Sequence, residues 1–363
     1  MTTESVLAAL RGVKDPDLGA DIVALKFVKD KDITIDGGRV VIAVEAATPS
    51  PVKREAVAKL VKDAVQNLGA SDVTVTTSFS VRSVSAPETG KPPLPGVKNV
   101  IAVGAGKGGV GKTTVSVNLA VALSKMGAKV GLLDADIYGP NIPIMLGLQA
   151  QLQTENKRIV PAQKYGIQVI SMGFLTQDEA PVIWRGPMLH SAIQQFCREA
   201  LWNNLDYLIV DMPPGTGDVA LSLSQTAPTA GSIVVTTPQQ VSLADSRRAV
   251  RMYQKLNIPT LGLVENMSFY ECTNCHHVAD IFGHGGGEEI AKQLEIPFLG
   301  RLPLYQPIRV GSDRGIPLVI AEPDSAGTKA FMDLAEATVS QLAVSAYKSA
   351  VANKGKIPLI QVK

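Results

Sequence analysis

Residues 106–114 read Gly-Lys-Gly-Gly-Val-Gly-Lys-Thr-Thr and directly follow the apolar run Ile101–Val103. The stretch fits the pattern G-x-x-x-x-G-K-S/T, and a strand before it with a helix after it is the setting in which that pattern binds phosphate. Glycines let successive backbone N–H groups turn towards a phosphate, and the helix that begins near Lys112 points its positive end to the same place. A glycine-rich turn that binds nothing is the alternative, and it would not explain this setting. The stretch therefore predicts a phosphate-binding loop.

The residues of this loop have expected roles in binding ATP. The Lys112 ammonium group is expected to reach the β- and γ-phosphates, and the Thr113 hydroxyl is expected to bind Mg²⁺. The residues expected around the phosphates are Gly106, Lys107, Gly108, Gly109, Val110, Gly111, Lys112, Thr113 and Thr114.

Apolar runs alternate with helical patterns over the rest of the chain after residue 99. The runs are continuous, which is typical of strands that are covered on both faces of a parallel sheet. This order predicts an α/β fold, a doubly wound, mostly parallel-sheet P-loop domain. The expected strands are Val100–Val103, Lys129–Leu133, Ile167–Ser171, Tyr207–Val210, Gly231–Thr236, Thr260–Val264 and Phe298–Leu302. The expected helices include Lys112–Met126, Pro187–Trp202 and Leu243–Leu256.

A stretch rich in proline and glycine separates the first part of the chain from this domain. Four of the fourteen residues from Ala86 to Asn99 are Pro and two are Gly, which is the composition of an extended linker. We therefore expect a small α+β domain at residues 1–85, a linker at residues 86–98 and the P-loop ATPase domain at residues 99–350. The small domain is expected to contain helices Ser5–Val13 and Pro51–Leu68 and strands Ile22–Val28, Ile33–Ile35, Val40–Val44 and Val73–Thr77. A last helix, from Ser325 to Val351, is expected to pack back on the large sheet.

The charge and the cysteine content disfavour several classes of protein. Lys and Arg number 35 against 33 Asp and Glu, so the net charge of +2 implies no strong field and disfavours nucleic acid as the main partner. Met1–Leu10 has neither the basic nor the apolar part of an export signal, and no apolar run reaches the roughly 18 residues of a membrane-spanning helix. Three cysteines are too few for a disulfide scaffold, and Cys197, in a helical pattern, is expected to be a small core residue. We therefore expect a cytoplasmic protein without a nucleic-acid or membrane partner.

Acidic side chains stand at the carboxyl ends of two predicted strands, where ligands of open α/β sheets bind. Asp134 and Asp136 end the strand that follows the phosphate-binding loop, and Asp211 comes directly after the strand Tyr207–Val210. Asp211 is placed to hold Mg²⁺ through water, and the loop after it, residues 212–218, is rich in Gly and Pro and could sense the γ-phosphate. Each aspartate taken singly could instead cap a helix. Their joint presence beside a phosphate-binding loop favours a nucleotide site.

Cys272 and Cys275 form a C-x-x-C pair in a polar stretch without a helical pattern. Two thiolates can bind one metal centre but cannot complete a four-thiolate shell, whereas two copies of the chain would supply the four that a 4Fe-4S cluster needs. Three alternatives remain open. With His276 the pair matches a haem-attachment pattern, with two of His276, His277 and His284 it could bind zinc, and alone it could be a redox pair.

A second lysine, Lys107, distinguishes this loop from an ordinary phosphate-binding loop. With it the loop resembles the deviant Walker A family, which includes MinD, ParA, the nitrogenase iron protein and the ATPases that target tail-anchored proteins. The resemblance implies a homodimer in which Lys107 crosses the interface and acts on the partner's nucleotide, as an arginine finger does. It also implies that Asp136 orients the attacking water, that Asp134 supports the Mg²⁺ shell beside Asp211, and that Asn266 recognises adenine. The catalytic residues so implied are Lys107, Lys112 and Asp136. A solvated lysine and an asparagine in a turn are the alternatives for Lys107 and Asn266.

Further stretches narrow the resemblance to one branch. They are D-A-D-I-Y-G-P-N-I-P, W-R-G-P-M, D-M-P-P-G-T-G-D and E-N-M-S followed by C-x-x-C. Over Lys98 to Val319 the chain resembles the Mrp/ApbC proteins, bacterial iron–sulfur carrier ATPases. The resemblance implies a labile 4Fe-4S cluster held between two protomers at Cys272 and Cys275, with ATP controlling its loading or release. It implies apo iron–sulfur proteins and cluster-assembly scaffolds as partners.

The first domain resembles the small domain that often precedes these ATPases and occurs alone in iron–sulfur assembly factors. The residues that carry this resemblance are Asp15–Pro16–Asp17 and Asp21–Ile22–Val23. Those domains often carry a cysteine in a stretch like T-P-x-C-P, whereas Thr48–Pro49–Ser50–Pro51 has none. Partner docking is therefore an alternative to cluster chemistry for this domain.

Two other functions compete with the carrier hypothesis. A spatial organiser like ParA or MinD would need a basic DNA-binding face or a C-terminal amphipathic membrane helix, and it would not explain the cysteine pair. The final residues, 354–363, are short for a membrane anchor and are interrupted by Pro358. A zinc-stapled dimeric ATPase would use the cysteine pair only to fix the dimer.

Overall fold

The computed structural model describes most of the chain in two compact units. The described residues are 1–84, 93–137, 139–149, 153–174, 186–215, 217–272, 274–275 and 277–352. The small unit comprises the described residues up to Val84 and those from Val339 onward, and the large unit comprises the residues between them. Of the segments singled out above, residues 86–92, 138, 184–185, 216, 276 and 354–363 lie outside the described residues.

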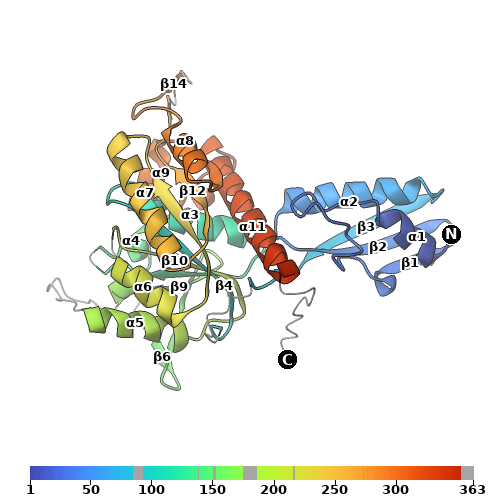
Figure 1. The fold of residues 1–363 in the computed structure, drawn as a ribbon, viewed down its shortest axis with the longest axis horizontal. Coiled ribbons are helices and arrows are strands. Elements are labelled where there is room, and N and C mark those ends of the chain that lie inside the picture. The colour runs from blue at the N-terminus through green and yellow to red at the C-terminus, as the bar shows by residue number, and fades with distance from the viewer. Residues whose placement is uncertain are drawn as a thin grey trace. The chain divides into compact units, whose positions relative to one another are not determined.

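A three-stranded sheet in the order β1-β2-β3 forms the centre of the small unit (Figure 1). β1 (Ile33–Asp36) pairs antiparallel with β2 (Arg39–Ala46), and β2 pairs parallel with β3 (Asp72–Phe79). A parallel pair needs a crossover, which the helix α2 (Pro51–Gln66) supplies. α1 (Thr3–Leu10) packs on the same core, so the α+β class expected for this unit is confirmed.

The segment Ile22–Val28 is a series of turns, so the strand expected there is wrong. Ile22, Leu25, Phe27 and Val28 of this segment are nevertheless buried in the core of the small unit. The Asp21 carboxylate accepts a hydrogen bond from the backbone N–H of Val23 at 2.7 Å, which folds the chain into a turn. A local bond from side chain to backbone therefore overrides the apolar pattern.

The stretch Thr48–Pro49–Ser50–Pro51, which lacks a cysteine, forms the start of α2. The buried Ser50 hydroxyl accepts a hydrogen bond from the backbone N–H of Lys53 at 3.2 Å, and Pro51 occupies the first turn. In this chain the stretch therefore serves as a helix cap.

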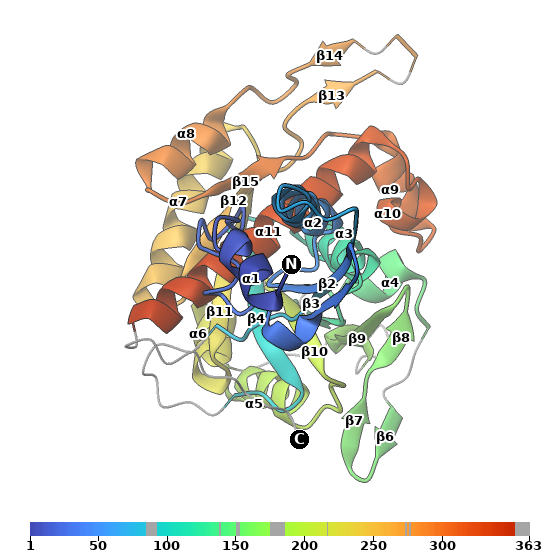
Figure 2. The ribbon, with the colours of Figure 1, turned by 90° about the vertical axis from the view of Figure 1, so that its right-hand side faces the viewer.

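An eight-stranded sheet forms the centre of the large unit, in the order β15-β12-β11-β4-β10-β5-β9-β8 (Figure 2). All seven expected strands are present and neighbours among them are parallel, which confirms the doubly wound α/β class. Their bounds are β4 (Val97–Ala105), β5 (Val130–Asp134), β9 (Ile167–Ser171), β10 (Leu205–Asp211), β11 (Thr229–Thr236), β12 (Thr260–Glu265) and β15 (Phe298–Arg301). The edge strand β8 (Ala162–Lys164), which the apolar runs do not indicate, pairs antiparallel with β9.

Helices cover both faces of this sheet. α5 (Gly186–Arg198), α6 (Gly217–Thr226) and α7 (Gln240–Lys255) share one buried cluster with side chains of β4, β5 and β10. Figure 2 shows α3 (Lys112–Lys125) on the side of the sheet away from α5. The other helices are α4 (Ile142–Leu146), α8 (Gly286–Gln293), α9 (Gln306–Asp313), α10 (Leu318–Ala321) and α11 (Ala326–Ala352).

Among the described residues, the remaining elements are two short hairpins and two single 3-10 turns. Two-stranded hairpins are formed by β6 (Gln153–Glu155) with β7 (Arg158–Val160) and by β13 (Tyr270–Glu271) with β14 (Val278–Ala279). Figure 2 shows β13 and β14 projecting from the sheet. Single 3-10 turns lie at Asp30–Asp32 and Met172–Phe174. None of the described helices combines the length and the apolar character that crossing a bilayer requires.

Candidate functional site

The phosphate-binding loop joins the end of β4 to the start of α3. Gly111 precedes α3 with a φ of 81°, and a Cβ atom there would lie 2.2 Å from the side-chain nitrogen of Asn266. A Cβ atom on Gly106 would lie 2.2 Å from the backbone carbonyl carbon of Asp245 in α7. The left-handed backbone and these close approaches explain why the loop needs glycine at both positions.

A cavity of about 490 Å³ lies in front of this loop. Residues 107–114 line it together with Asp136, Asn266 and Met267. Further lining residues are Pro303, Leu304 and Tyr305 and, from α9, Ile308, Arg309, Ser312 and Asp313. Cavities of this size hold small ligands and cofactors. The structure therefore brings Lys107, Lys112, Thr113, Asp136 and Asn266 of the predicted site to one space.

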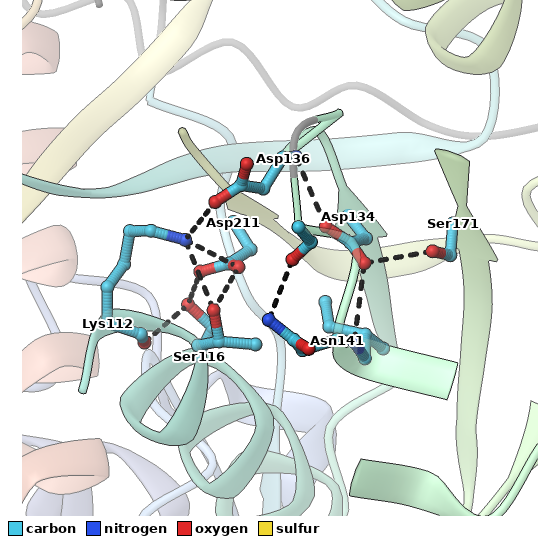
Figure 3. Close-up of polar contacts among 10 residues, drawn as sticks. Lys112, Ser116, Asp134, Asp136, Asn141, Ser171 and Asp211 are labelled. Carbon is cyan, nitrogen blue, oxygen red and sulfur yellow. Dashed lines mark hydrogen bonds and ion pairs between the residues drawn. The ribbon is translucent and has the colours of Figure 1, made fainter. Parts of the chain in front are cut away.

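Asp211 is the centre of a buried network beneath the loop (Figure 3). Its Oδ2 atom accepts hydrogen bonds from Lys112 Nζ at 2.7 Å and from Thr113 Oγ1 at 2.8 Å. Its Oδ1 atom accepts a hydrogen bond from Ser116 Oγ at 2.6 Å. The Asp136 carboxylate lies 3.6 Å from the same Lys112 nitrogen. One lysine therefore stands between two carboxylates, and its single positive charge offsets part of their negative charge.

Asp134 holds the loop that follows β5. Its Oδ1 atom accepts a hydrogen bond from the backbone N–H of Asp136 at 3.1 Å, and its Oδ2 atom accepts hydrogen bonds from the N–H of Ile142 at 3.3 Å and from Ser171 Oγ at 2.9 Å (Figure 3). Burial, together with the negative charge of Asp211, raises the pKa of Asp134 to about 7. Burial also raises the pKa of Asp136, although the positive charge of Lys112 opposes this shift.

Sequence reasoning missed Ser116 and Ser171, the two serines that orient these carboxylates. Ser171 ends β9 and stands beside Asp134 in the neighbouring strand β5. Its place at the carboxyl end of a predicted strand was the available signal. Ser116 lies one helical turn after Lys112, and its hydroxyl, which donates its one hydrogen to Asp211 at 2.6 Å, also lies 3.1 Å from the Lys112 carbonyl oxygen.

The hydroxyl and carboxylate oxygens at this loop are of the kind that bind Mg²⁺. Thr113 and Asp211 offer a hydroxyl and a carboxylate in direct contact, and Asp136 offers a second carboxylate on the cavity wall. Mg²⁺ takes oxygen ligands and is commonly held by one or two carboxylates, water and substrate phosphates. Asp134 and Asp211 are both fully buried, and the oxygens of both carboxylates already accept hydrogen bonds, so Thr113 and Asp136 are the members of this group that line the cavity.

Asn266 connects the end of β12 to the phosphate-binding loop. Its side-chain nitrogen donates a hydrogen bond to the carbonyl oxygen of Val110 at 2.9 Å, and the residue is buried. Asn266 therefore supports the loop, whatever it contributes to recognition of a base.

The two cysteines of the pair lie on the projecting hairpin. Cys272 is half-buried directly after β13, and Cys275 is exposed at the turn. The backbone N–H of Cys272 donates to the carbonyl oxygen of His277 at 3.0 Å, which closes the hairpin. His284 faces Asp280, with 3.3 Å between Nδ1 and Oδ2. Within the part of the chain that the structure describes, no three His, Cys, Asp or Glu side chains are grouped as metal ligands.

Cys197 is separate from this pair. It is fully buried in α5, and burial raises the pKa of its thiol to about 12. The expected core position is confirmed, and the thiol is kept neutral.

Both parts of the chain match families of proteins that handle iron or iron–sulfur clusters. The sequence profile of the NUBPL iron-transfer P-loop NTPases matches residues 96–339, and that of the iron–sulfur cluster assembly proteins matches residues 3–77. An iron–sulfur cluster carrier protein of Synechocystis sp. is 45% identical over 354 residues, covering 95% of this chain and 99% of that one. One from Deinococcus radiodurans is 42% identical over 344 residues, with 94% and 96% covered. A nucleotide-binding protein of Archaeoglobus fulgidus, solved with ADP, superimposes with a TM-score of 0.57 at 36% identity, covering 65% of this chain and 93% of that one.

Proposed function

This chain belongs to the NUBPL iron-transfer P-loop NTPase family, and from that premise we propose that it is an ATP-hydrolysing iron–sulfur cluster carrier. In this proposal two copies hold one labile 4Fe-4S cluster between them as cargo. Each copy supplies Cys272 and Cys275. ATP binding and hydrolysis control loading of the cluster, or its release to apo-proteins, and cluster-assembly scaffolds supply it.

The observation that carries the proposal is the placement of the two cysteines on a projecting hairpin. The pair offers two thiols, one of them exposed, and no further group of metal ligands is found among the described residues. A 4Fe-4S cluster takes four thiolates, so a second copy would complete the shell. The relatives named as carriers and the match to the iron–sulfur assembly profile support this cargo.

Hydrolysis in this proposal rests on positioning and charge. The backbone N–H groups of the loop and Lys112 bind the phosphates, and Asp136, on the cavity wall, orients the attacking water. Mg²⁺ would be held by the Thr113 hydroxyl and, through water, by Asp211, and it would neutralise charge on the phosphates. Asp134 is assigned a positioning role, because its three hydrogen bonds hold the loop that carries Asp136.

Anaerobic reconstitution of the full chain with iron and sulfide tests the cargo. We expect about four iron and four sulfide per two chains, with the absorbance of a 4Fe-4S cluster, because four thiolates from two chains complete the shell. Metal analysis and the mass of the native complex give the stoichiometry. Tightly bound zinc in place of iron would support the zinc-stapled ATPase instead. A chain that binds neither metal and localises with DNA or membrane would support the spatial organiser.

A mixing experiment tests whether Lys107, which lines the cavity, acts on the partner's nucleotide. The Lys107→Ala and Lys112→Ala variants should each be inactive in hydrolysis. In a mixed dimer, the site that retains Lys112 faces a partner that retains Lys107, so part of the activity should return. Heterodimer formation is checked by mass. No recovery in confirmed heterodimers would show that Lys107 does not act across an interface.

A further inference from the structure

The Glu265 carboxylate connects the two ends of the segment that carries the cysteine hairpin. Glu265 is fully buried at the end of β12. Its Oε1 atom accepts a hydrogen bond from Ser268 Oγ at 2.6 Å, and its Oε2 atom accepts one from the backbone N–H of Gly287 at 2.6 Å. Ser268 lies two residues before the hairpin strands, and Gly287 lies eight residues after them in the first turn of α8, so one side chain holds both ends of this segment.

The segment that leads into the hairpin, residues 267–269, forms part of the wall of the nucleotide cavity. The N–H of Ser268 donates to the carbonyl oxygen of Leu302 at 2.9 Å, and the N–H of Leu304 donates to that of Phe269 at 2.7 Å. These two segments therefore run together, and they contribute Met267 and Leu304 to the lining of the cavity. Met267, which a ligand in the cavity would contact, precedes Cys272 by five residues in a hydrogen-bonded segment.

The segment that leads out of the hairpin is fixed at the first turn of α8. Gly285, which precedes this helix, has no side chain to cap it, and the Glu265 carboxylate accepts the N–H of Gly287 in its place. A negative charge is favourable at a helix N-terminus. A Cβ atom on Gly287 would lie 2.9 Å from Glu265 Oε2 and 3.1 Å from Glu265 Cβ, so a larger residue here would displace the Glu265 side chain.

The next residue, Asn266, supports the phosphate-binding loop through its bond to Val110. Two consecutive side chains at the end of β12 therefore hold the two parts of the molecule: Glu265 holds the hairpin and Asn266 holds the loop. This gives the E-N-M-S stretch, residues 265–268, a physical explanation that its pattern alone did not provide.

We propose that Glu265 is a positioning residue that fixes the cysteine hairpin to the wall of the nucleotide cavity, so that nucleotide in the cavity changes the accessibility of Cys272. The proposal takes the nucleotide and the cargo from the proposed function, but the coupling itself is a property of the empty hairpin. A nucleotide that packs on Met267 and Leu304 restrains the segment that leads into the hairpin, and the half-buried Cys272 thiol then becomes less accessible. The exposed Cys275 thiol is expected to respond less.

Thiol alkylation of the full chain, without iron, measures this coupling. Iodoacetamide labelling of Cys272 is followed by mass spectrometry with and without Mg–ADP, with Cys275 as the internal reference. In the parental protein Mg–ADP should slow the labelling of Cys272. In Glu265→Ala and Ser268→Ala, labelling should be about tenfold faster and independent of nucleotide, because a hydrogen bond to a buried charged group is lost.

Two further variants separate positioning from general loss of stability. Glu265→Gln should retain the response, because its amide oxygen can accept the Gly287 N–H while its nitrogen donates to the Ser268 hydroxyl. Ser246→Ala is the matched control: Ser246 is as buried as Ser268, at 1% exposure, and its hydroxyl donates to Ser242 O at 2.8 Å within α7. It should also retain the response.

The outcomes distinguish this proposal from the function on which it rests. Calorimetry first establishes that Mg–ADP binds. If it binds and labelling of Cys272 in the parental protein does not change, the coupling is refuted while the proposed function stands. A parental response in both Glu265→Ala and Ser268→Ala would equally refute the role of Glu265. If Mg–ADP does not bind, the nucleotide function and the coupling are both overturned. Should Glu265→Ala fail to fold by circular dichroism, Ser268→Ala carries the test.

Discussion

Replacement of Lys112 should abolish ATP hydrolysis, with a loss of at least about 100-fold in the rate, because the phosphates lose the positive charge fixed beside them. Lys112→Ala also leaves the Asp211 carboxylate without its buried partner at 2.7 Å. An uncompensated buried charge costs about 3–5 kcal/mol of folding free energy, so the alanine variant can lose activity by unfolding. Lys112→Gln retains a hydrogen-bond donor for Asp211 and is the sharper variant. Steady-state hydrolysis and thermal denaturation are measured for both.

Asp136→Ala is the matched control for this experiment. Its carboxylate lines the same cavity, but its proposed role is to orient water. The variant should therefore bind ATP with an affinity near that of the parental protein while losing turnover. Hydrolysis by a folded Lys112→Gln protein at the parental rate would refute the role of the lysine. The same result for Asp136→Ala would refute the water-orienting assignment.

The central sheet could be predicted because its strands are buried on both faces. The strand Leu205–Asp211 is buried at every position, and its central residues, Tyr207–Val210, appear in the sequence as a continuous apolar run. The short edge strand β8, with no fully buried residue, leaves no such signal. The sequence is informative where burial alone decides the structure.

The segment Ile22–Val28 shows where this reasoning fails. Its side chains are as apolar as those of a strand, but the Asp21 side chain competes for the backbone N–H groups and produces turns. Lys26 also has a φ of 62°, a left-handed conformation that no strand accommodates. The apolar pattern therefore reflects the buried side chains of this segment, but the strand that it predicted is wrong.

The candidate site likewise has residues that could be predicted from the sequence and contacts that could not. The loop at residues 106–114 and the aspartates at strand ends could be predicted, because their chemistry is local or follows from strand direction. The contacts that orient them could not. Ser171 and Asp134 are 37 residues apart, Ser116 and Asp211 are 95 apart, and Asn266 and Val110 are 156 apart. Such pairs depend on tertiary packing: the position of a serine or an asparagine at a strand end indicates that it is near the site, but not which group it contacts.

Replacement of either cysteine of the hairpin should remove the cluster. In Cys272→Ser or Cys275→Ser each dimer would offer two thiolates instead of four, and a hydroxyl is a far poorer ligand for iron in a cluster than a thiolate. We expect reconstituted cluster content to fall from about one per two chains to the background level. Iron and sulfide analysis with absorbance spectroscopy measures this loss.

Two comparisons make the cysteine experiment specific. Cys197→Ala should retain the cluster, because Cys197 is fully buried in α5 and its thiol is neutral. ATP hydrolysis by the hairpin variants should persist at least in part, because the cavity is lined by residues other than the cysteine pair. A loss of hydrolysis together with the cluster would mean that the hairpin serves the nucleotide site itself. A cluster that persists in both Cys272→Ser and Cys275→Ser would rule out the proposed ligands, since no arrangement of two copies could then supply four thiolates from this pair.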